Sequence, residues 1–594
     1  MNSPSQHDRR HRFDPERHRE QLVAIIREIE SLGRIDRAGL DAVLRRHPRG
    51  GVGFFSRAEL IAGHRHFAAR EGFGAERDFA DRVQLRPVRS QSGVTPLTVL
   101  TKPFPCPGEC VFCPSDVRMP KSYLSDEPGA QRAANNRFDP YLQTWNRLDA
   151  LGSIGHPTEK IELIVLGGTW SFYPESYRIW FSVRCLEAMN DFGAGVDGRA
   201  AAVAQTPDFA ALGEVVSGNR SERGAYNKIV SGFLGAQQDG ALMARGEQAS
   251  WKRLEEAQRA NEEAGCRNVG FSVETRPDAV DEAETQRIRR LGATKVQLGF
   301  QSLDDAVLAA NKRGHDVATT RRAVGLLRRA GFKIHAHWMP NLLGATPEGD
   351  VADFERLFAD PGLRPDELKV YPCSLIESAE LMRFFEAGEW RPYEYDELLA
   401  VLTAALERTP RYCRITRMIR DISSDDIVEG NKLTNFREIA QRALEERGGG
   451  CEDVRSREIR GRRFAQDQLC LRETRYSSDE GEECFLEFVT PDDEIVAFLR
   501  LSLPGSRAFL DEIAGSALVR EVHVYGAALG LGARSSEKAQ HRGLGTRLLD
   551  EAAQRARHAG FRDLAVISAV GTRGYYRKLG FSDGMLYQHR SLAR

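Results

Sequence analysis

The chain has 594 residues, of which 41% are hydrophobic and 28% are charged, and its formal net charge is −1. These values are typical of a globular protein with ample core, and the length predicts about three or four domains. A net charge this close to zero excludes a uniformly basic surface for nucleic acid, although a local cluster of Arg and Lys would still suffice. No apolar run approaches the roughly 20 residues that span a membrane, and no secretory signal is evident, so we expect a cytoplasmic protein without membrane contact.

Residues 1–82 are expected to form a small helical module. Apolar residues recur every three or four positions from Leu22 to Leu32, and the pattern continues between Phe54 and Ala69. The first 20 residues mix His and Arg with acids. This composition fits either a solvated, partly disordered tail or an arm that contacts nucleic acid.

A cysteine-rich loop occupies residues 101–114, TKPFPCPGECVFCP, in which Cys106, Cys110 and Cys113 have the spacing C-x3-C-x2-C. Three thiolates on one loop can bind three irons of a [4Fe–4S] cube and leave the fourth iron open to another ligand. A zinc ribbon would need a second cysteine pair nearby, and none occurs before Cys185. The spacing resembles that of the radical S-adenosylmethionine (SAM) superfamily, whose open iron binds the cofactor's methionyl amine and carboxylate.

Strand-like runs then alternate with helical segments, at 160–168, 268–275, 295–302, 333–340 and 367–373. The alternation predicts a parallel α/β domain over 83–374, an open or complete TIM-like barrel, with a mostly peripheral insertion at 191–250. Such folds carry their active sites where the strands end. The candidates for cofactor contact at these ends are Gly167, Gly168, Thr169, Glu274, Gln297 and Gln301.

The superfamily resemblance gives the first three of these positions a role. It implies that Gly167–Thr169 replaces a Gly-Gly-Glu turn that contacts the methionyl amine, and with Thr in place of Glu the contact would come mainly from the backbone. Lys102, beside the cysteine loop, is a candidate for cofactor or substrate-anion binding or acid–base catalysis. An ordinary surface lysine is the alternative for Lys102.

A second set of metal ligands is suggested by two histidines and two cysteines. His335 and His337 are two residues apart in a strand and therefore share a face, Cys373 ends the next strand, and Cys413 lies in the following segment. Two imidazoles and two thiolates suit a structural zinc ion. Buried histidines and free cysteines without a metal are the alternative.

Residues 375–455 are expected to form a mainly helical connector, in which Arg414, Arg417 and Arg420 recur every three residues. The arginines could form a nucleic-acid surface or interdomain salt bridges. Residues 456–594 begin with antiparallel strands, and Gln540, His541, Arg542, Gly543, Leu544 and Gly545 then open a helix. Backbone N–H groups at such a helix start cradle a pyrophosphate. The order of elements resembles the acetyl-coenzyme A site of GNAT-type acetyltransferases, with further candidates at Glu521, His523, Val524, Tyr575 and Tyr576.

The two halves and the motifs SVETRPD, QLGFQS, NKRGH, REVHVYG and VISAVGTRGYYRKLGF together resemble the catalytic subunit of Elongator, in a prokaryotic form. The resemblance implies a [4Fe–4S] cluster, SAM and acetyl-CoA, with Gln540, Gly543 and Gly545 binding acetyl-CoA and Tyr575 and Tyr576 near its thioester. It also implies a tRNA wobble-uridine carboxymethyltransferase. A 5′-deoxyadenosyl radical would take a hydrogen from the acetyl methyl group, whose carbon adds to carbon 5 of the uridine, and hydrolysis would leave a carboxymethyl group.

The implied partners are a tRNA anticodon loop, acetyl-CoA and a reductant, and a homodimer is left open. Two other interpretations remain. One is a protein lysine acetyltransferase with a structural iron–sulfur domain, for which Glu521 is the general base we would nominate. The other is a non-catalytic subunit that binds tRNA and cofactor as ligands.

Overall fold

The computed structural model describes residues 13–32, 35–49, 53–83, 93–206, 225–237, 243–244, 246–460, 462, 464–505, 509–525 and 543–593. The chain divides into two compact units. The first comprises Met1–Thr95 with Asn146–Thr158, and the second comprises Pro96–Trp145 with Glu159–Arg594.

The first unit contains the helices expected near the start of the chain. They are α1 (Arg19–Ser31), α2 (Arg37–Arg46), α3 (Arg57–Glu71) and α4 (Glu76–Val83), after a short 3-10 turn at Pro15–His18. The apolar stripe of α1 packs with α3 around a core that includes Leu22, Ile26 and Phe67. The start of α3 is fixed by a capping box, because Ser56 and Glu59 each bind the other's backbone N–H.

An open seven-stranded sheet forms the centre of the second unit, in the order β1-β2-β3-β4-β5-β6-β8. Neighbouring strands from β2 to β8 are parallel. The strands are β1 (Thr95–Leu100), β2 (Lys160–Leu166), β3 (Arg267–Thr275), β4 (Lys295–Gln301), β5 (Lys333–Trp338), β6 (Glu367–Val370) and β8 (Arg414–Arg417). The predicted parallel α/β barrel is confirmed in its open form.

Helices connect these strands, as parallel pairing requires. Those that alternate with the strands are α7 (Glu175–Gly193), α11 (Trp251–Asn261), α12 (Glu282–Arg290), α14 (Val317–Arg329), α15 (Pro347–Ala359) and α17 (Tyr395–Arg408). Smaller helices are α5 (Pro128–Asn135), α6 (Pro140–Ser153), α8 (Arg199–Gln205), α10 (Tyr226–Gln237), α13 (Asp305–Ala310), α16 (Leu381–Glu386) and α18 (Phe436–Glu446). Residues 375–455 therefore contain three helices, but also β8 and a small ladder of β7 (Leu375–Ile376) with β9 (Ile427–Glu429).

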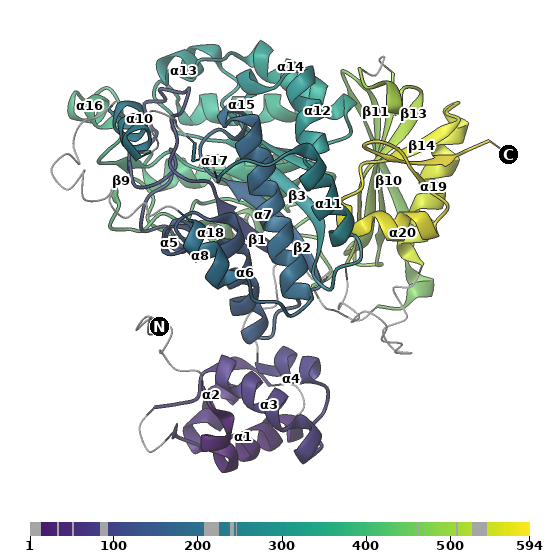
Figure 1. The fold of residues 1–594 in the computed structure, drawn as a ribbon. Coiled ribbons are helices and arrows are strands. Elements are labelled where there is room, and N and C mark those ends of the chain that lie inside the picture. Colours follow the sequence, from purple (N-terminus) through teal and green to yellow (C-terminus); the bar gives the residue numbers. More distant parts are fainter. Residues whose placement is uncertain are drawn as a thin grey trace. The chain divides into compact units, whose positions relative to one another are not determined.

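The C-terminal part forms a second sheet, in the order β10-β11-β12-β13-β14-β16-β15. Its strands are β10 (Cys470–Ser478), β11 (Gly481–Val489), β12 (Ile495–Pro504), β13 (Ser516–Val524), β14 (Asp563–Val566), β15 (Ser582–Asp583) and β16 (Gln588–Ser591). Figure 1 shows these strands in green and yellow, with α19 (Leu544–His558) against them and α20 (Arg573–Lys578) nearby. Strands β10 to β13 are antiparallel, whereas β13 and β14 are parallel.

Buried ion pairs join the two sheets within the second unit. Arg520 on β13 has no exposed surface, and its guanidinium binds the carboxylates of Asp366 at 2.7 and 2.8 Å and of Glu483 at 2.7 Å. Beside it, Lys333 at the start of β5 binds Glu521 on β13 at 2.6 Å. The C-terminal sheet is therefore fastened to the amino-terminal end of the parallel strands.

Candidate active site

The cysteine loop directly follows β1, at the carboxyl end of the parallel sheet. Cys106, Cys110 and Cys113 are all free, partly exposed thiols. The Cys110 sulfur accepts hydrogen bonds from Arg313 at 3.0 Å and from Arg276 at 3.8 Å. Burial raises the pKa of Cys110, but the two guanidiniums outweigh it and leave that pKa below its usual value. Burial raises the pKa of the Cys113 thiol to about 11.

These residues fit a [4Fe–4S] cluster in their chemistry. A cube binds each thiolate to a different iron, so its ligands need not converge on one point. No group of three His, Cys, Asp or Glu side chains within the described ranges converges to hold a single ion. Gly108 lies between two of the cysteines, and a Cβ atom there would stand 2.3 Å from the Arg276 guanidinium. The loop is therefore shaped to admit Arg276 against the Cys110 thiolate.

The Gly-Gly turn after β2 lies against this loop. Gly167 has φ 119° and Gly168 has φ 57°, and a Cβ atom on Gly167 would stand 2.2 Å from the Thr101 hydroxyl. The Thr169 hydroxyl lies 3.9 Å from the Cys106 sulfur. The predicted Gly167–Thr169 turn and the cysteine loop are thus brought together, and the lack of a side chain on Gly167 allows the close approach of Thr101.

Gln301 at the end of β4 is held in an unusual conformation. It has φ 69°, a value rare for a residue with a side chain, and its buried Oε1 atom has no hydrogen-bond partner. A strained backbone and an unsatisfied buried oxygen both carry a free-energy cost. Such features favour a site that a ligand completes.

The remaining predicted strand-end residues meet inside the barrel. Gln297 Oε1 accepts hydrogen bonds from Lys369 and from His337 Nε2, the latter at 3.2 Å. Glu274 accepts a hydrogen bond from the Tyr123 hydroxyl at 3.4 Å and lies 3.7 Å from His337 Nδ1. Burial lowers the pKa of Lys369 to about 8. We call these five residues the strand-end cluster.

Lys369 and Tyr123 were missed from the sequence as parts of this cluster. Lys369 lies in the strand ELKV, where a lysine between two buried apolar residues marks the face opposite the helices. That alternation is the signal that could have identified it.

Lys102 is buried, with 1% of its side chain exposed, so it is not a surface lysine. Its ammonium group pairs with Glu247 and lies 5.5 Å above the ring of Tyr177. Burial lowers its pKa, against the opposing effect of Glu247. This contact fixes a residue of the 191–250 insertion next to the cysteine loop.

The predicted zinc site does not form. His335 Nε2 contacts the Thr416 hydroxyl at 2.9 Å, while His337 belongs to the strand-end cluster. Cys373 lies in an apolar cluster with Leu342 and Leu375. Cys413 precedes β8 whereas Cys373 follows β6, and because the two strands are parallel these cysteines belong to opposite ends of the sheet. The zinc prediction was therefore wrong, although the two histidines do share a face.

The three arginines proposed as a cationic stripe are each paired with an acid. Arg414 binds Glu458 at 2.6 Å, Arg417 binds Asp421 at 2.7 Å, and Arg420 binds Glu127 at 2.6 Å. Two of these partners come from distant segments, which favours internal salt bridging over a nucleic-acid surface.

The second candidate site lies where β13 and β14 separate. The two strands pair only from Ser516 to Val519, so Arg520–Val524 extends beyond the ladder. Gly543, with φ 104°, directly precedes α19, and a Cβ atom on Gly545 would stand 2.6 Å from the Tyr575 hydroxyl and 3.7 Å from the Val524 side chain. The first turn of α19, with Leu544 buried, therefore lies beside Val524 and Tyr575, and a helix start of this kind can bind a phosphate group.

Neighbouring side chains differ in their accessibility. Tyr576 is buried and packs edge-on against Tyr575. His523 stacks on Phe498, and burial lowers its pKa to about 4. Gln540, His541 and Arg542 lie outside the described residues.

Glu521 is fully engaged with cations. It binds Lys333 at 2.6 Å and Arg500 at 2.9 Å. Burial raises the pKa of Glu521, but the two cations lower that pKa by a larger amount, so the net shift is downward. A carboxylate held ionised in this way is a weak general base.

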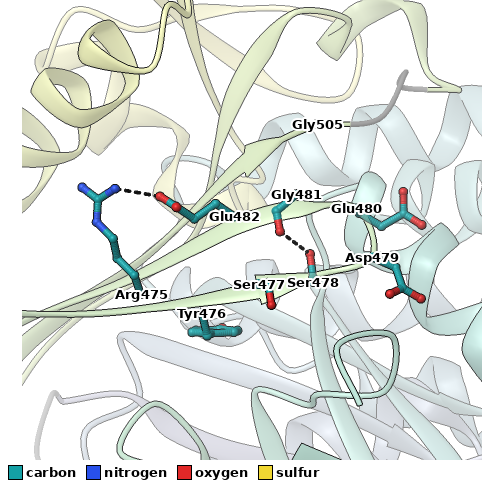
Figure 2. A pocket seen from close by; sticks show the side chains of 9 residues that line it. All are labelled: Arg475, Tyr476, Ser477, Ser478, Asp479, Glu480, Gly481, Glu482 and Gly505. Atoms are coloured by element: carbon teal, nitrogen blue, oxygen red, sulfur yellow. Dashed lines mark hydrogen bonds and ion pairs between the residues drawn. The ribbon is translucent and has the colours of Figure 1, made fainter. Parts of the chain in front are cut away.

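A hollow of about 620 Å³ lies at the β10–β11 turn and is lined by Arg475–Glu482 and Gly505. Figure 2 shows Arg475 pointing to Glu482, and Ser478 to the backbone of Gly481. None of the residues described above lines it, and we assign it no ligand.

Comparison with known families defines the class first. The chain matches the Radical SAM superfamily over residues 238–356, the Radical_SAM C-terminal domain over 365–446 and the Acetyltransferase (GNAT) family over 451–581. It is therefore a radical SAM protein with a GNAT domain in the same chain, as predicted. The first match begins after the cysteine loop, so the cluster assignment depends on the residues of that loop.

Full-length relatives then define the family. The chain is 36% identical to the tRNA uridine(34) acetyltransferase of Dehalococcoides mccartyi, over 83% of this chain and 96% of the relative. It is 31% identical to human Elongator complex protein 3, over 84% of each chain. The solved Elp3 of Methanocaldococcus infernus, lacking residues 1–46, aligns with a TM-score of 0.66 and 32% identity, covering 84% of this chain and all of that one. The chain belongs to the tRNA uridine(34) acetyltransferase and Elongator complex protein 3 family. In the part of the chain described here, no helix has both the length and the apolar character needed to cross a membrane.

Proposed function

We propose that the protein is a tRNA wobble-uridine carboxymethyltransferase that joins the acetyl methyl carbon of acetyl-CoA to carbon 5 of the uridine. The observation that carries the proposal is that strands β3 to β6 connect both candidate sites. Glu274 and Gln301 lie at the carboxyl ends of β3 and β4, the end of the sheet that carries the cysteine loop, and Gln297 lies further back within β4. Lys333 at the amino end of β5 binds Glu521 of the GNAT domain. The names of the relatives, tRNA uridine(34) acetyltransferase, agree with this proposal.

The cysteine loop would hold the cluster through Cys106, Cys110 and Cys113. A [4Fe–4S] cluster with SAM, when bound there, supplies a 5′-deoxyadenosyl radical that can take hydrogen from an unactivated methyl group. Arg313 and Arg276 lower the pKa of Cys110 and so favour the thiolate that binds iron. The backbone of Gly167–Thr169 and the unsatisfied Gln301 Oε1 atom would orient the methionyl group of SAM.

The GNAT domain would bind acetyl-CoA. The first turn of α19, from Gly543 to Gly545, offers backbone N–H groups to the pyrophosphate. Tyr575, which is 43% exposed, and the buried Tyr576 would lie near the thioester. Val524 and His523 would border the acetyl group, in the segment of β13 that β14 leaves unpaired.

The strand-end cluster would receive the uridine base. A base from a single-stranded anticodon loop can turn out into a protein pocket, where polar groups contact its edges. Gln297 and Lys369 are suited to this because both are polar, with Gln297 buried and Lys369 half-buried. In this function we expect bound tRNA to stimulate thioester cleavage, since free hydrolysis would consume acetyl-CoA without product.

The test is anaerobic. The reconstituted protein receives dithionite, SAM, acetyl-CoA labelled in its methyl group and unmodified tRNA, and the digested nucleosides are analysed by mass spectrometry. We expect label in a carboxymethyluridine, and none with Cys110→Ser; Cys470→Ser, which changes an exposed cysteine outside the loop, is the matched control. Label on protein lysines instead would support a lysine acetyltransferase, which the ion pairs of Glu521 with Lys333 and Arg500 disfavour. If 5′-deoxyadenosine forms while the tRNA stays unlabelled, the proposed substrate is wrong.

A further inference from the structure

Helix α10 lies in the 191–250 insertion, yet it contacts the cysteine loop directly. The side-chain amide of Asn227 makes two hydrogen bonds to the backbone of a single residue, Cys106. Its Oδ1 atom accepts from the Cys106 N–H at 2.9 Å, and its Nδ2 atom donates to the Cys106 carbonyl oxygen at 2.8 Å. The described part of the insertion is therefore not merely peripheral.

Further contacts fasten the insertion before and after the three cysteines. Before the cysteines, Glu247 pairs with the buried ammonium group of Lys102. After the cysteines, the buried Tyr226 donates a hydrogen bond to the carbonyl oxygen of Met119 at 2.7 Å. The ammonium group of Lys121 lies 5.0 Å above the ring of Tyr226. Asn227 thus lies between two anchors, with its amide held against the first cysteine.

Cys106 and Cys110 differ in how their sulfur atoms are held. Cys110 is bound at its sulfur by Arg313. The sulfur of Cys106 has only longer contacts, 3.4 Å from the N–H of Gly108 and 3.9 Å from the Thr169 hydroxyl. The position of the first thiolate therefore depends on the backbone that carries it, and the Asn227 amide holds that backbone.

We propose that Asn227 is a positioning residue for the iron–sulfur cluster, which fixes the Cys106 thiolate by binding both backbone groups of that cysteine. The proposal rests on the proposed function in one respect, that the cysteine loop holds a [4Fe–4S] cluster. Groups that orient metal ligands commonly change metal retention by 10- to 100-fold. Asn227 is exposed, so water competes for its hydrogen bonds and we expect the lower end of that range.

The test compares cluster retention in variants of the full chain. Asn227→Leu removes both hydrogen bonds at similar volume, and Asn227→Asp keeps only the acceptor for the Cys106 N–H. Lys228→Ala is the matched control, because Lys228 is the next residue on α10 and is also exposed. Each protein is reconstituted anaerobically, and the loss of cluster absorbance is followed after adding an iron chelator. Electron paramagnetic resonance of the reduced cluster and thermal unfolding are recorded in parallel.

We expect Asn227→Leu to lose its cluster about 10-fold faster than wild type, with an altered resonance spectrum. Asn227→Asp should fall between the two, and Lys228→Ala should match wild type. Wild-type retention and spectrum in Asn227→Leu would overturn the proposal, as would equal losses in the leucine variant and the control. If wild-type protein binds no cluster at all, the proposed function fails, and this proposal fails with it. If wild type binds a cluster but modifies no tRNA, only the proposed function fails.

Discussion

Replacing Arg520 with Met should uncouple the GNAT domain from the barrel. The Arg520 guanidinium is fully buried and binds two carboxylates, those of Asp366 and Glu483. It also donates to the carbonyl oxygen of Phe332 at 3.1 Å. Methionine fills similar volume but supplies no charge, so both carboxylates keep their burial and lose their main partner.

The size of the stability loss depends on the partners that the two carboxylates keep. Asp366 would keep Arg500, whose guanidinium lies 3.5 Å away, and Glu483 would keep the Ser502 hydroxyl at 2.7 Å. Breaking a buried ion pair by removing one partner costs about 3–5 kcal/mol. Because both acids retain a weaker partner, we expect a loss of about 3 kcal/mol in the free energy of unfolding.

Urea unfolding followed by fluorescence and circular dichroism measures this loss. Arg475→Met is the matched control, since Arg475 on β10 pairs with Glu482 in an exposed setting and exposed pairs contribute about 0–1 kcal/mol. In the folded wild-type protein, Arg520 and Arg500 together hold the pKa of Asp366 below its usual value. In Arg520→Met that pKa rises, so the deficit against wild type should shrink as the pH falls toward the carboxyl range.

A double variant tests the reasoning itself. Adding Asp366→Asn to Arg520→Met removes one of the two buried carboxylate charges that have lost Arg520 and should recover part of the lost stability. A loss of less than about 1 kcal/mol in Arg520→Met, or no recovery in the double variant at any pH, would refute the argument from unpaired buried charge.

Three other predictions follow from contacts described above or nearby in the fold. His589 binds Asp563 at 2.8 Å, and its hydrogen bonds to acids raise its pKa to about 9. The stability that protonated His589 contributes is fully present below the pKa of histidine in the unfolded chain, and it is lost as the pH rises through about 9. His589→Gln should therefore lower the thermal midpoint clearly at about pH 6 and hardly at about pH 10, and equal shifts at both pH values would contradict this. Gly167→Ala should weaken SAM binding and lower the free energy of unfolding, the latter by about 1–3 kcal/mol from backbone strain alone. The effect should exceed that of Gly195→Ala, where φ is 73° but no atom lies near the added Cβ. Equal effects measured by calorimetry would exclude the close approach to Thr101 as the cause. Arg313→Gln should lower the reduction potential of the cluster, because a positively charged hydrogen-bond donor to the Cys110 sulfur is lost, and an unchanged potential in a redox titration would count against this contact.

Five parallel strands could be predicted from the sequence because each is a long apolar run between helical segments. The structure places all five within one to three residues of the expected ends. Strand β8 was not identified. β8 has the sequence RITR, and the recurrence of arginine every third residue concealed a strand whose period is two.

The candidate site was predictable where the signal is local. The cysteine loop, the Gly-Gly turn and the glycines before α19 depend on spacing within a few residues. The zinc hypothesis failed because it needed to know which end of a strand each cysteine occupies, and this depends on the sheet order. Asn227 could not be found either, since its partner Cys106 lies 121 residues earlier in the chain.

Arg289 of α12 has a consequence for how the chain is made. Its guanidinium donates to the carbonyl oxygens of Leu586 and Ser568, which belong to the GNAT domain and leave the ribosome almost 300 residues later. Until then the newly made barrel presents Arg289, Arg328 and Asp366 without the groups that will cover them. A nascent chain in this state is exposed to misassembly and to chaperone binding. Residues of the GNAT domain are thus needed to complete the barrel that precedes it in the chain.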